Sequence, residues 1–118
     1  VHDYANQPEA FYHGFILALT VSLMDRYYIF SNHESGFGRP DLLIIPKNPE
    51  KSLAVILEFK GVTEGQSLEN SAKQALEQIQ QKEYAAIIQQ YSHIHSIASV
   101  GMAFDGKRVK CESFINPV

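Results

Sequence analysis

The chain has 118 residues, which is enough for one domain with a hydrophobic core and too few for two. Hydrophobic residues make up 45% of it and charged residues 19%, and these fractions exclude a disordered or fibrous protein. The formal net charge of −3 excludes a polycation, so binding to any polyanion must use a local basic patch or a bound cation.

Cys111 is the only cysteine, which excludes an internal disulfide and a cysteine-based zinc site. It favours a reducing compartment, and we expect a cytoplasmic protein. The longest apolar stretch, GFILALTVSLM, contains Thr20 and Ser22 and is too short for a membrane span, so no membrane partner is expected. Because the sequence starts with Val1 rather than Met, we expect residues 1–118 to be one domain of a longer protein.

The first predicted element is a helix from Pro8 to about Tyr27, because apolar residues recur there at the spacing of an amphipathic helix. Asn6 supplies a capping side chain just before it. The segment RYYIFS, residues 26–31, is rich in aromatic and β-branched residues and predicts a strand. The glycines and the proline of NHESGFGRP, residues 32–40, indicate a connection rich in turns.

Two further strands are predicted at DLLIIP, residues 41–46, and at SLAVILEFK, residues 52–60. The dipeptide Asn48-Pro49 between them is a turn signal. Because both segments are apolar almost throughout, we expect them to be covered on both faces of a sheet.

The last part of the sequence predicts a mostly polar helix over residues 68–90 and then two strands. SIASVGMAFDG and KRVKCESFI form these strands, because Asp105-Gly106 between them is a favoured hairpin turn. The order of elements is therefore helix, three strands, helix and two strands, which indicates an α/β domain.

Three charged side chains lie at the open end of the central hairpin. If its turn is centred near Pro49, Asp41 falls opposite Glu58 in an antiparallel pair. Lys60 points to the same face as Glu58 and Phe59 to the other, because side chains alternate along a strand. The sequence thus predicts a cluster of two carboxylates and one ammonium.

This cluster has the parts that phosphodiester hydrolysis requires. Two close carboxylates repel each other unless a positive group joins them, and hard oxygen ligands suit Mg²⁺ or Mn²⁺ rather than zinc. Such a cation polarises a phosphoryl oxygen and activates a bound water, which a lysine can orient. The alternative is a surface salt bridge at the strand ends.

Pro40-Asp41, followed by Glu58-Phe59-Lys60 at the end of the next strand, resembles the PD-(D/E)XK nuclease superfamily. More narrowly, the segments FYHGFILAL, SNHESGFGRPDLLIIP, ILEFK, QALEQIQQKEYA and GMAFDGK resemble the nuclease-like domain at the C-terminus of bacterial AAA-ATPase-like proteins. The resemblance implies a restriction-endonuclease-like αβββαβ core with a mixed central sheet flanked by helices. It also implies a nuclease that uses Mg²⁺, with Mn²⁺ as a substitute, and cuts DNA rather than RNA.

The resemblance also implies residue roles. The Asp and Glu of the motif bind Mg²⁺, the Lys acts on the attacking water, a Glu of the first helix completes the metal shell, and a Gln of the next helix assists. In this sequence the matching residues are Asp41, Glu58, Lys60, Glu9 and Gln78, with Gln74 as the less favoured alternative to Gln78. For Glu9, the helix dipole alone is an equally good explanation, and Gln78 has the alternative of a solvated side chain.

Four other residues are candidates for binding substrate. Arg39 can bind a phosphate in bidentate fashion after the glycines of its loop. His13 lies one helical turn after Glu9, where a phosphate contact and a packed histidine are equally expected. Gln74 and Tyr84 complete the set, although Tyr84 is better explained as an anchor of its helix.

The expected partners are DNA, a second copy in a homodimer, and an upstream ATPase domain in the parent protein. The rival hypothesis is a nuclease-fold module that has lost turnover and serves in protein or nucleic-acid binding. An intact motif counts against this rival. Lys107, Arg108 and Lys110 form a basic cluster that either touches a nucleic-acid backbone or protects an edge strand from aggregation.

Overall fold

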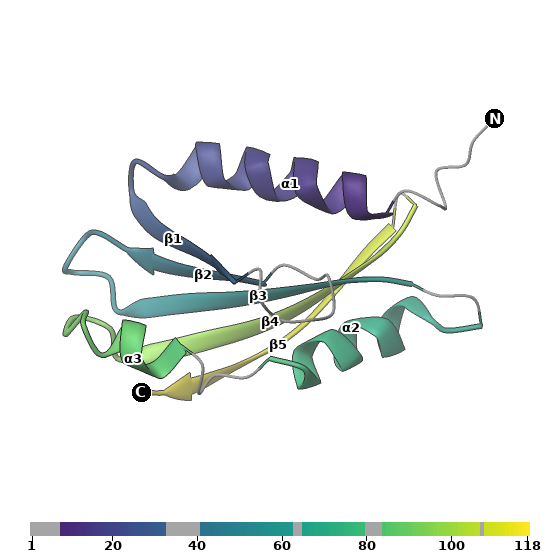
Figure 1. The fold of residues 1–118 in the computed structure, drawn as a ribbon. Coiled ribbons are helices and arrows are strands. Elements are labelled where there is room, and N and C mark those ends of the chain that lie inside the picture. The colour runs from purple at the N-terminus through teal and green to yellow at the C-terminus, as the bar shows by residue number, and fades with distance from the viewer. Residues whose placement is uncertain (1–7, 33–40, 63–64, 80–83, 107) are drawn as a thin grey trace.

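The computed structural model describes residues 8–32, 41–62, 65–79, 84–106 and 108–118. A five-stranded sheet in the order β1-β2-β3-β4-β5 has helix α1 on one face and helices α2 and α3 on the other (Figure 1). The strands are β1 (Tyr27–Asn32), β2 (Asp41–Pro46), β3 (Leu53–Gly61), β4 (Ser96–Asp105) and β5 (Arg108–Pro117). The helices are α1 (Pro8–Leu23), α2 (Leu68–Glu77) and α3 (Ala85–Ile88).

The sheet is mixed. Strands β1, β2 and β3 pair antiparallel, β3 and β4 pair parallel, and β4 and β5 pair antiparallel. A parallel pair needs a crossover connection, which α2 and α3 supply between β3 and β4. The predicted α/β class, the αβββαβ core and the mixed central sheet are confirmed.

The central hairpin has the register that the sequence predicts, with Asp41 paired to Glu58. Its turn is closed by Asn48, whose side-chain Oδ1 accepts a hydrogen bond from the backbone N–H of Glu50 at 2.9 Å. The carbonyl of Asn48 also accepts from the N–H of Lys51 at 3.0 Å. A side-chain hydrogen bond of this kind stabilises an Asx turn. The position of this turn determines the register in which the two strands pair.

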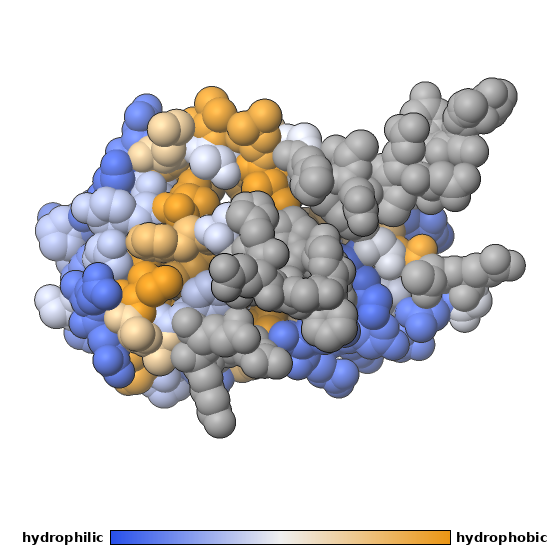
Figure 2. Space-filling view, in the orientation of Figure 1, coloured by the Kyte–Doolittle hydropathy of each residue, from blue (hydrophilic) through white to orange (hydrophobic). Residues whose placement is uncertain are grey.

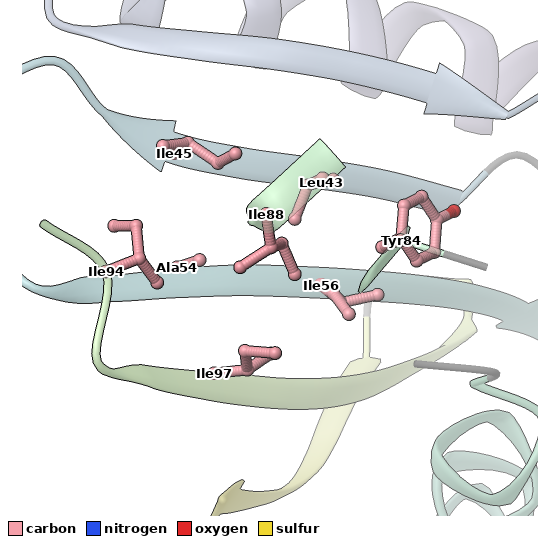
Figure 3. Close-up of a cluster of buried hydrophobic side chains, with 8 residues drawn as sticks. All are labelled: Leu43, Ile45, Ala54, Ile56, Tyr84, Ile88, Ile94 and Ile97. Carbon is pink, nitrogen blue, oxygen red and sulfur yellow. The ribbon is translucent and has the colours of Figure 1, made fainter. Parts of the chain in front are cut away.

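Strand β2 is buried on both faces, as its continuous apolar sequence predicts. Leu42 and Ile44 belong to the hydrophobic cluster under α1, whereas Leu43 and Ile45 belong to the cluster on the opposite face. Figure 3 shows this second cluster, in which Ile88 lies over strands β2 and β3. The sheet therefore separates two cores, and each helix layer covers one of them.

The cluster under α1 is built around aromatic rings. Phe59 of β3 lies edge-on to Phe15 of α1 at a centroid distance of 5.7 Å and stacks on Phe104 of β4 at 6.1 Å. The outer side of α1 is also apolar: Leu17 and Val21 are 65% and 61% exposed, and Figure 2 shows the hydrophobic surface over this helix. Only the inner side of α1 contributes to the core.

The single helix predicted over residues 68–90 is wrong. Helix α2 ends at Glu77 and a separate short helix, α3, starts at Ala85. Helix α2 lies on β4, whereas Tyr84 and Ile88 pack into the cluster on β2 and β3. Residues 80–83 lie outside the described part. The two contact regions lie over different strands of one face, and a straight helix cannot follow both on a twisted sheet.

The first helix is also shorter than predicted, because it ends at Leu23 rather than near Tyr27. The N–H of Arg26 bonds to the carbonyl of Leu23 at 3.0 Å, which turns the chain before β1 begins. At the other end of the sheet, the predicted hairpin is confirmed: Asp105 pairs with Arg108, and Gly106 has the positive φ of 61° that the tight turn requires.

In the part of the chain that the structure describes, no helix is long and apolar enough to cross a membrane.

The aromatic core under α1 can be tested with Phe59→Ala. We expect the free energy of unfolding to fall by about 3 to 5 kcal/mol, because the change leaves a cavity among buried rings. Urea denaturation followed by circular dichroism measures this. The control is Leu17→Ala on the exposed side of α1, for which we expect a change within about 0.5 kcal/mol. Equal effects of the two substitutions would contradict the assignment of the core.

Candidate active site

Glu58 and Asp41 lie side by side in the middle of the sheet. Glu58 pairs with Asp41 of β2 on one side and with Gly101 of β4 on the other. The side chain of Asp41 lies outside what the structure describes, and its place in the site is known from the backbone register alone. Glu58 is only 7% exposed, which is unusual for a carboxylate.

Lys60 is held by a residue of helix α2. Its Nζ donates a hydrogen bond of 2.6 Å to Oε1 of Gln74. Helix α2 begins at a capped end, since the hydroxyl of Ser67 accepts from the N–H of Asn70 at 3.0 Å. Because Gln74 belongs to α2, its contact with Lys60 shows that α2 covers the face of the sheet on which Lys60 lies. Glu58 lies on the same face, since it is two residues from Lys60 on the strand.

Gly101 allows α2 to come this close to the sheet. A Cβ atom at Gly101 would lie 2.3 Å from the backbone N of Leu76 and 2.4 Å from the backbone O of Ala72. These are backbone atoms of α2, which cannot move aside without moving the helix. Since Gly101 is the β4 partner of Glu58, the closest approach of the helix lies beside the site.

The sequence did not single out Gly101, although a signal was present. An isolated glycine inside a predicted strand, here in SVGMAF, often marks the close approach of another backbone. Gln74 was named in the sequence analysis only as the less favoured alternative. The favoured Gln78 is the C-cap residue of α2 and is exposed, and the hydrogen bond to Lys60 comes from Gln74, one turn earlier.

The remaining candidates are placed as follows. Arg39 lies outside the described residues, as do the side chains of Glu9 and His13. Helix α1, which carries Glu9 and His13, packs on the face opposite to the one that carries Glu58. Tyr84 is only 3% exposed and lies in the cluster with Ile88 (Figure 3). Its burial favours the anchoring role over contact with a substrate.

The donor set of the site fits a hard divalent cation. Two carboxylates on adjacent strands offer oxygen ligands, which Mg²⁺ and Mn²⁺ prefer. A carboxylate as buried as Glu58 is stable in its charged form only with hydrogen-bond donors or a cation beside it. The side chains that the structure describes contain no group of three His, Cys, Asp or Glu that could hold a metal ion. The side chain of Asp41 is not one of the described side chains.

The fold and the site together define an α/β domain of the restriction-endonuclease-like class, in which Lys60 bonds to a helix that covers the mixed sheet and Glu58 is paired in register with Asp41. The family model of the PD-(D/E)XK nuclease superfamily matches residues 7–114, and the chain belongs to this superfamily. The family suggests a nuclease, and its members generally use divalent metals. A comparison with curated proteins gives no significant match.

The close approach at Gly101 can be tested with Gly101→Ala. We expect a loss of about 1 to 3 kcal/mol in the free energy of unfolding, because the added methyl group overlaps the backbone of α2. The control is Gly14→Ala in α1, where no described atom beyond the adjoining part of the helix lies within 4 Å of the new methyl group. There we expect a gain of about 0.5 to 1 kcal/mol from helix propensity. If urea denaturation shows that both substitutions change the free energy of unfolding in the same direction, the close approach of α2 at Gly101 is refuted.

Proposed function

We propose that this domain is a metal-dependent nuclease that hydrolyses phosphodiester bonds, in DNA rather than RNA. The observation that carries the proposal is the bond between Lys60 and Gln74 on the face where Glu58 pairs with Asp41. This bond supports an arrangement in which the Lys60 ammonium lies near the two carboxylates, and these are the three residue types that define the motif of the superfamily.

Asp41 and Glu58 would hold Mg²⁺, with Mn²⁺ as a substitute. When bound, the ion polarises a phosphoryl oxygen and lowers the pKa of a coordinated water. Glu58 sits on a strand that is paired on both sides, and its side chain is only 7% exposed, so the carboxylate has little room to move. Such rigidity favours a fixed geometry of the oxygen ligands, which Mg²⁺ demands more strictly than Ca²⁺ does. Glu9 remains a proposed additional ligand.

Lys60 would orient the attacking water and stabilise the negative charge that develops on the phosphoryl group. An ammonium group has three N–H donors, and Gln74 accepts from one of them. The others can point toward water and phosphate oxygen. Because Gln74 comes from a helix fixed against β4, the ammonium is positioned before substrate arrives, and such preorganisation is a large source of catalysis.

Arg39 and His13 are proposed phosphate contacts. With the net charge of −3, the domain must draw on the bound cation or on such local contacts to attract a polyanion. An upstream ATPase domain in a longer parent protein and a cytoplasmic location are further parts of the proposal. They rest on the resemblance and on the single cysteine, respectively.

The rival function is a nuclease-fold module that binds protein or nucleic acid without turnover. No particular contact in the described residues favours it, whereas the intact acidic pair and the held lysine favour catalysis. The two hypotheses differ in one observable, which is metal-dependent cleavage.

The nuclease proposal is tested with a panel of single-stranded, duplex and branched DNA and RNA, incubated with Mg²⁺ or Mn²⁺. We expect cleavage that a chelator abolishes and that Asp41→Ala and Lys60→Ala each reduce by about 100-fold or more. Lys51→Ala, which removes the same charge from the exposed turn between β2 and β3, is the control and should cleave normally. Binding without cleavage by the wild type would move the conclusion to the rival.

The role of Gln74 is tested separately with Gln74→Leu, which keeps the approximate size of the side chain and removes the acceptor for Lys60. We expect the cleavage rate to fall by about 10-fold to 100-fold, because the ammonium is no longer held in place. Gln78→Leu tests the assignment that the sequence favours, and Asn70→Leu on the exposed side of α2 is the matched control. A larger loss with Gln78→Leu would restore the assignment favoured by the sequence.

A further inference from the structure

Strand β5 forms one edge of the sheet and is long for that position. It spans ten residues and pairs with β4 along its whole length. On its other side, no described residue pairs with it. A long edge with unpaired backbone groups is a template for adding another strand, and proteins usually shorten, cover or charge such edges.

The hydrogen bonds of β4 determine which residues of β5 direct their backbone outward. The carbonyl of Phe104 accepts from the N–H of Val62, so Phe104 directs its backbone groups toward β3. Its partner Val109 therefore belongs to a pair without hydrogen bonds, and its own N–H and C=O point to the open edge. The same holds for every second residue, including Cys111, Ser113 and Ile115.

The edge is apolar as well as unpaired. Val109 is 50% exposed, Ile115 is 63% exposed and Phe114 is 43% exposed. Three large exposed side chains on one strand are more than the scattered apolar residues of an ordinary surface. Val109 and Ile115 lie on one face of the sheet and Phe114 on the other, and the side chains of a strand paired with β5 would flank them.

The charged residues of β5 are complementary to those of a second, antiparallel copy of the same strand. Lys110 and Glu112 flank Cys111 symmetrically and point to the same face of the sheet, because they are two residues apart. A two-fold axis through Cys111 would place Lys110 of each copy opposite Glu112 of the other. The same axis would place Arg108 opposite Phe114, a cation opposite an aromatic ring.

We propose that β5 is a homodimer interface, in which two copies of this chain pair their β5 strands antiparallel about an axis through Cys111. The joined sheet would be continuous across the two copies. The proposal does not depend on catalysis, and its occupant is a second copy because the charge pattern is complementary to itself.

The charges select this register among its neighbours. A two-fold antiparallel pair keeps the faces of both sheets aligned only if the axis passes through a residue. An axis through Lys110 would set two lysines opposite each other, and an axis through Glu112 would set two glutamates opposite each other. Directly opposed like charges destabilise strand pairs. The axis through Lys110 also sets Arg108 opposite Glu112, but of these three axes only the one through Cys111 makes attractive pairs without setting like charges opposite each other.

The arrangement has a geometric consequence for the site. A two-fold axis perpendicular to the sheet keeps the α2 faces of both copies on the same side. The Glu58 and Lys60 side chains of both copies would therefore lie on one face of the joined sheet. Two sites on one face suit a substrate that has two strands.

Sedimentation velocity of the full chain over a concentration series tests the dimer and its charges. We expect a dimer for the wild type, weakening of about tenfold or more for Lys110→Glu or Glu112→Lys alone, and recovery in the double variant that exchanges the two charges. The control pair, Lys51→Glu and Glu50→Lys in the exposed turn between β2 and β3, should leave the dimer unchanged. Circular dichroism confirms that each variant is folded.

Two further variants test the backbone and the register. Ser113→Pro removes an outward N–H without removing a bond to β4, and we expect it to abolish the dimer while the monomer stays folded. A short bifunctional thiol reagent should link Cys111 across the axis. In the variant Cys111→Ser with Ser113→Cys, the two thiols should be roughly 13 Å apart along the strand and should not be linked.

A wild type that stays monomeric at every concentration would overturn the proposal. A dimer that survives both single charge reversals and Ser113→Pro would overturn it as well. Neither result bears on nuclease activity, so the failure of this proposal is distinguishable from the failure of the proposed function.

Discussion

The close contact between helix α2 and strand β4 at Gly101 is the constraint on which the site depends. With only a hydrogen atom at this position, the backbone of α2 lies against the strand that pairs with Glu58. The helix then presents Gln74 to Lys60 at hydrogen-bond distance. A longer distance between helix and sheet would leave the ammonium without its acceptor, and the site would lose its order even with every motif residue in place.

The topology explains why a helix is available at this point. Strands β3 and β4 are parallel, so the chain must cross from one end of the sheet to the other between them. The crossover passes over the face that carries Glu58 and Lys60, while α1 covers Leu57 and Phe59 on the reverse. Alternation along one strand thus serves the core with one set of side chains and the site with the other.

Burial of Glu58 joins stability to function. An ionised carboxylate that is only 7% exposed needs compensating donors or a cation, and removing them would leave a costly buried charge. Its position is nevertheless rigid, because the strands on both sides hold its backbone. A carboxyl group at this position is therefore costly to bury and held in one place, as the proposed role of Glu58 as a metal ligand requires.

The sequence by itself determined the class of the fold, the order of the elements and the register of the central hairpin. These follow from local rules: the turn at Asn48 and the alternation of β3 place Asp41, Glu58 and Lys60 without knowledge of the rest. Only the tertiary structure decided which glutamine holds Lys60 and where the second helix ends. Both depend on how α2 and α3 rest on a twisted sheet. The position of Gln74 depends in addition on the close contact at Gly101, which is far away in the sequence from the residues that it positions.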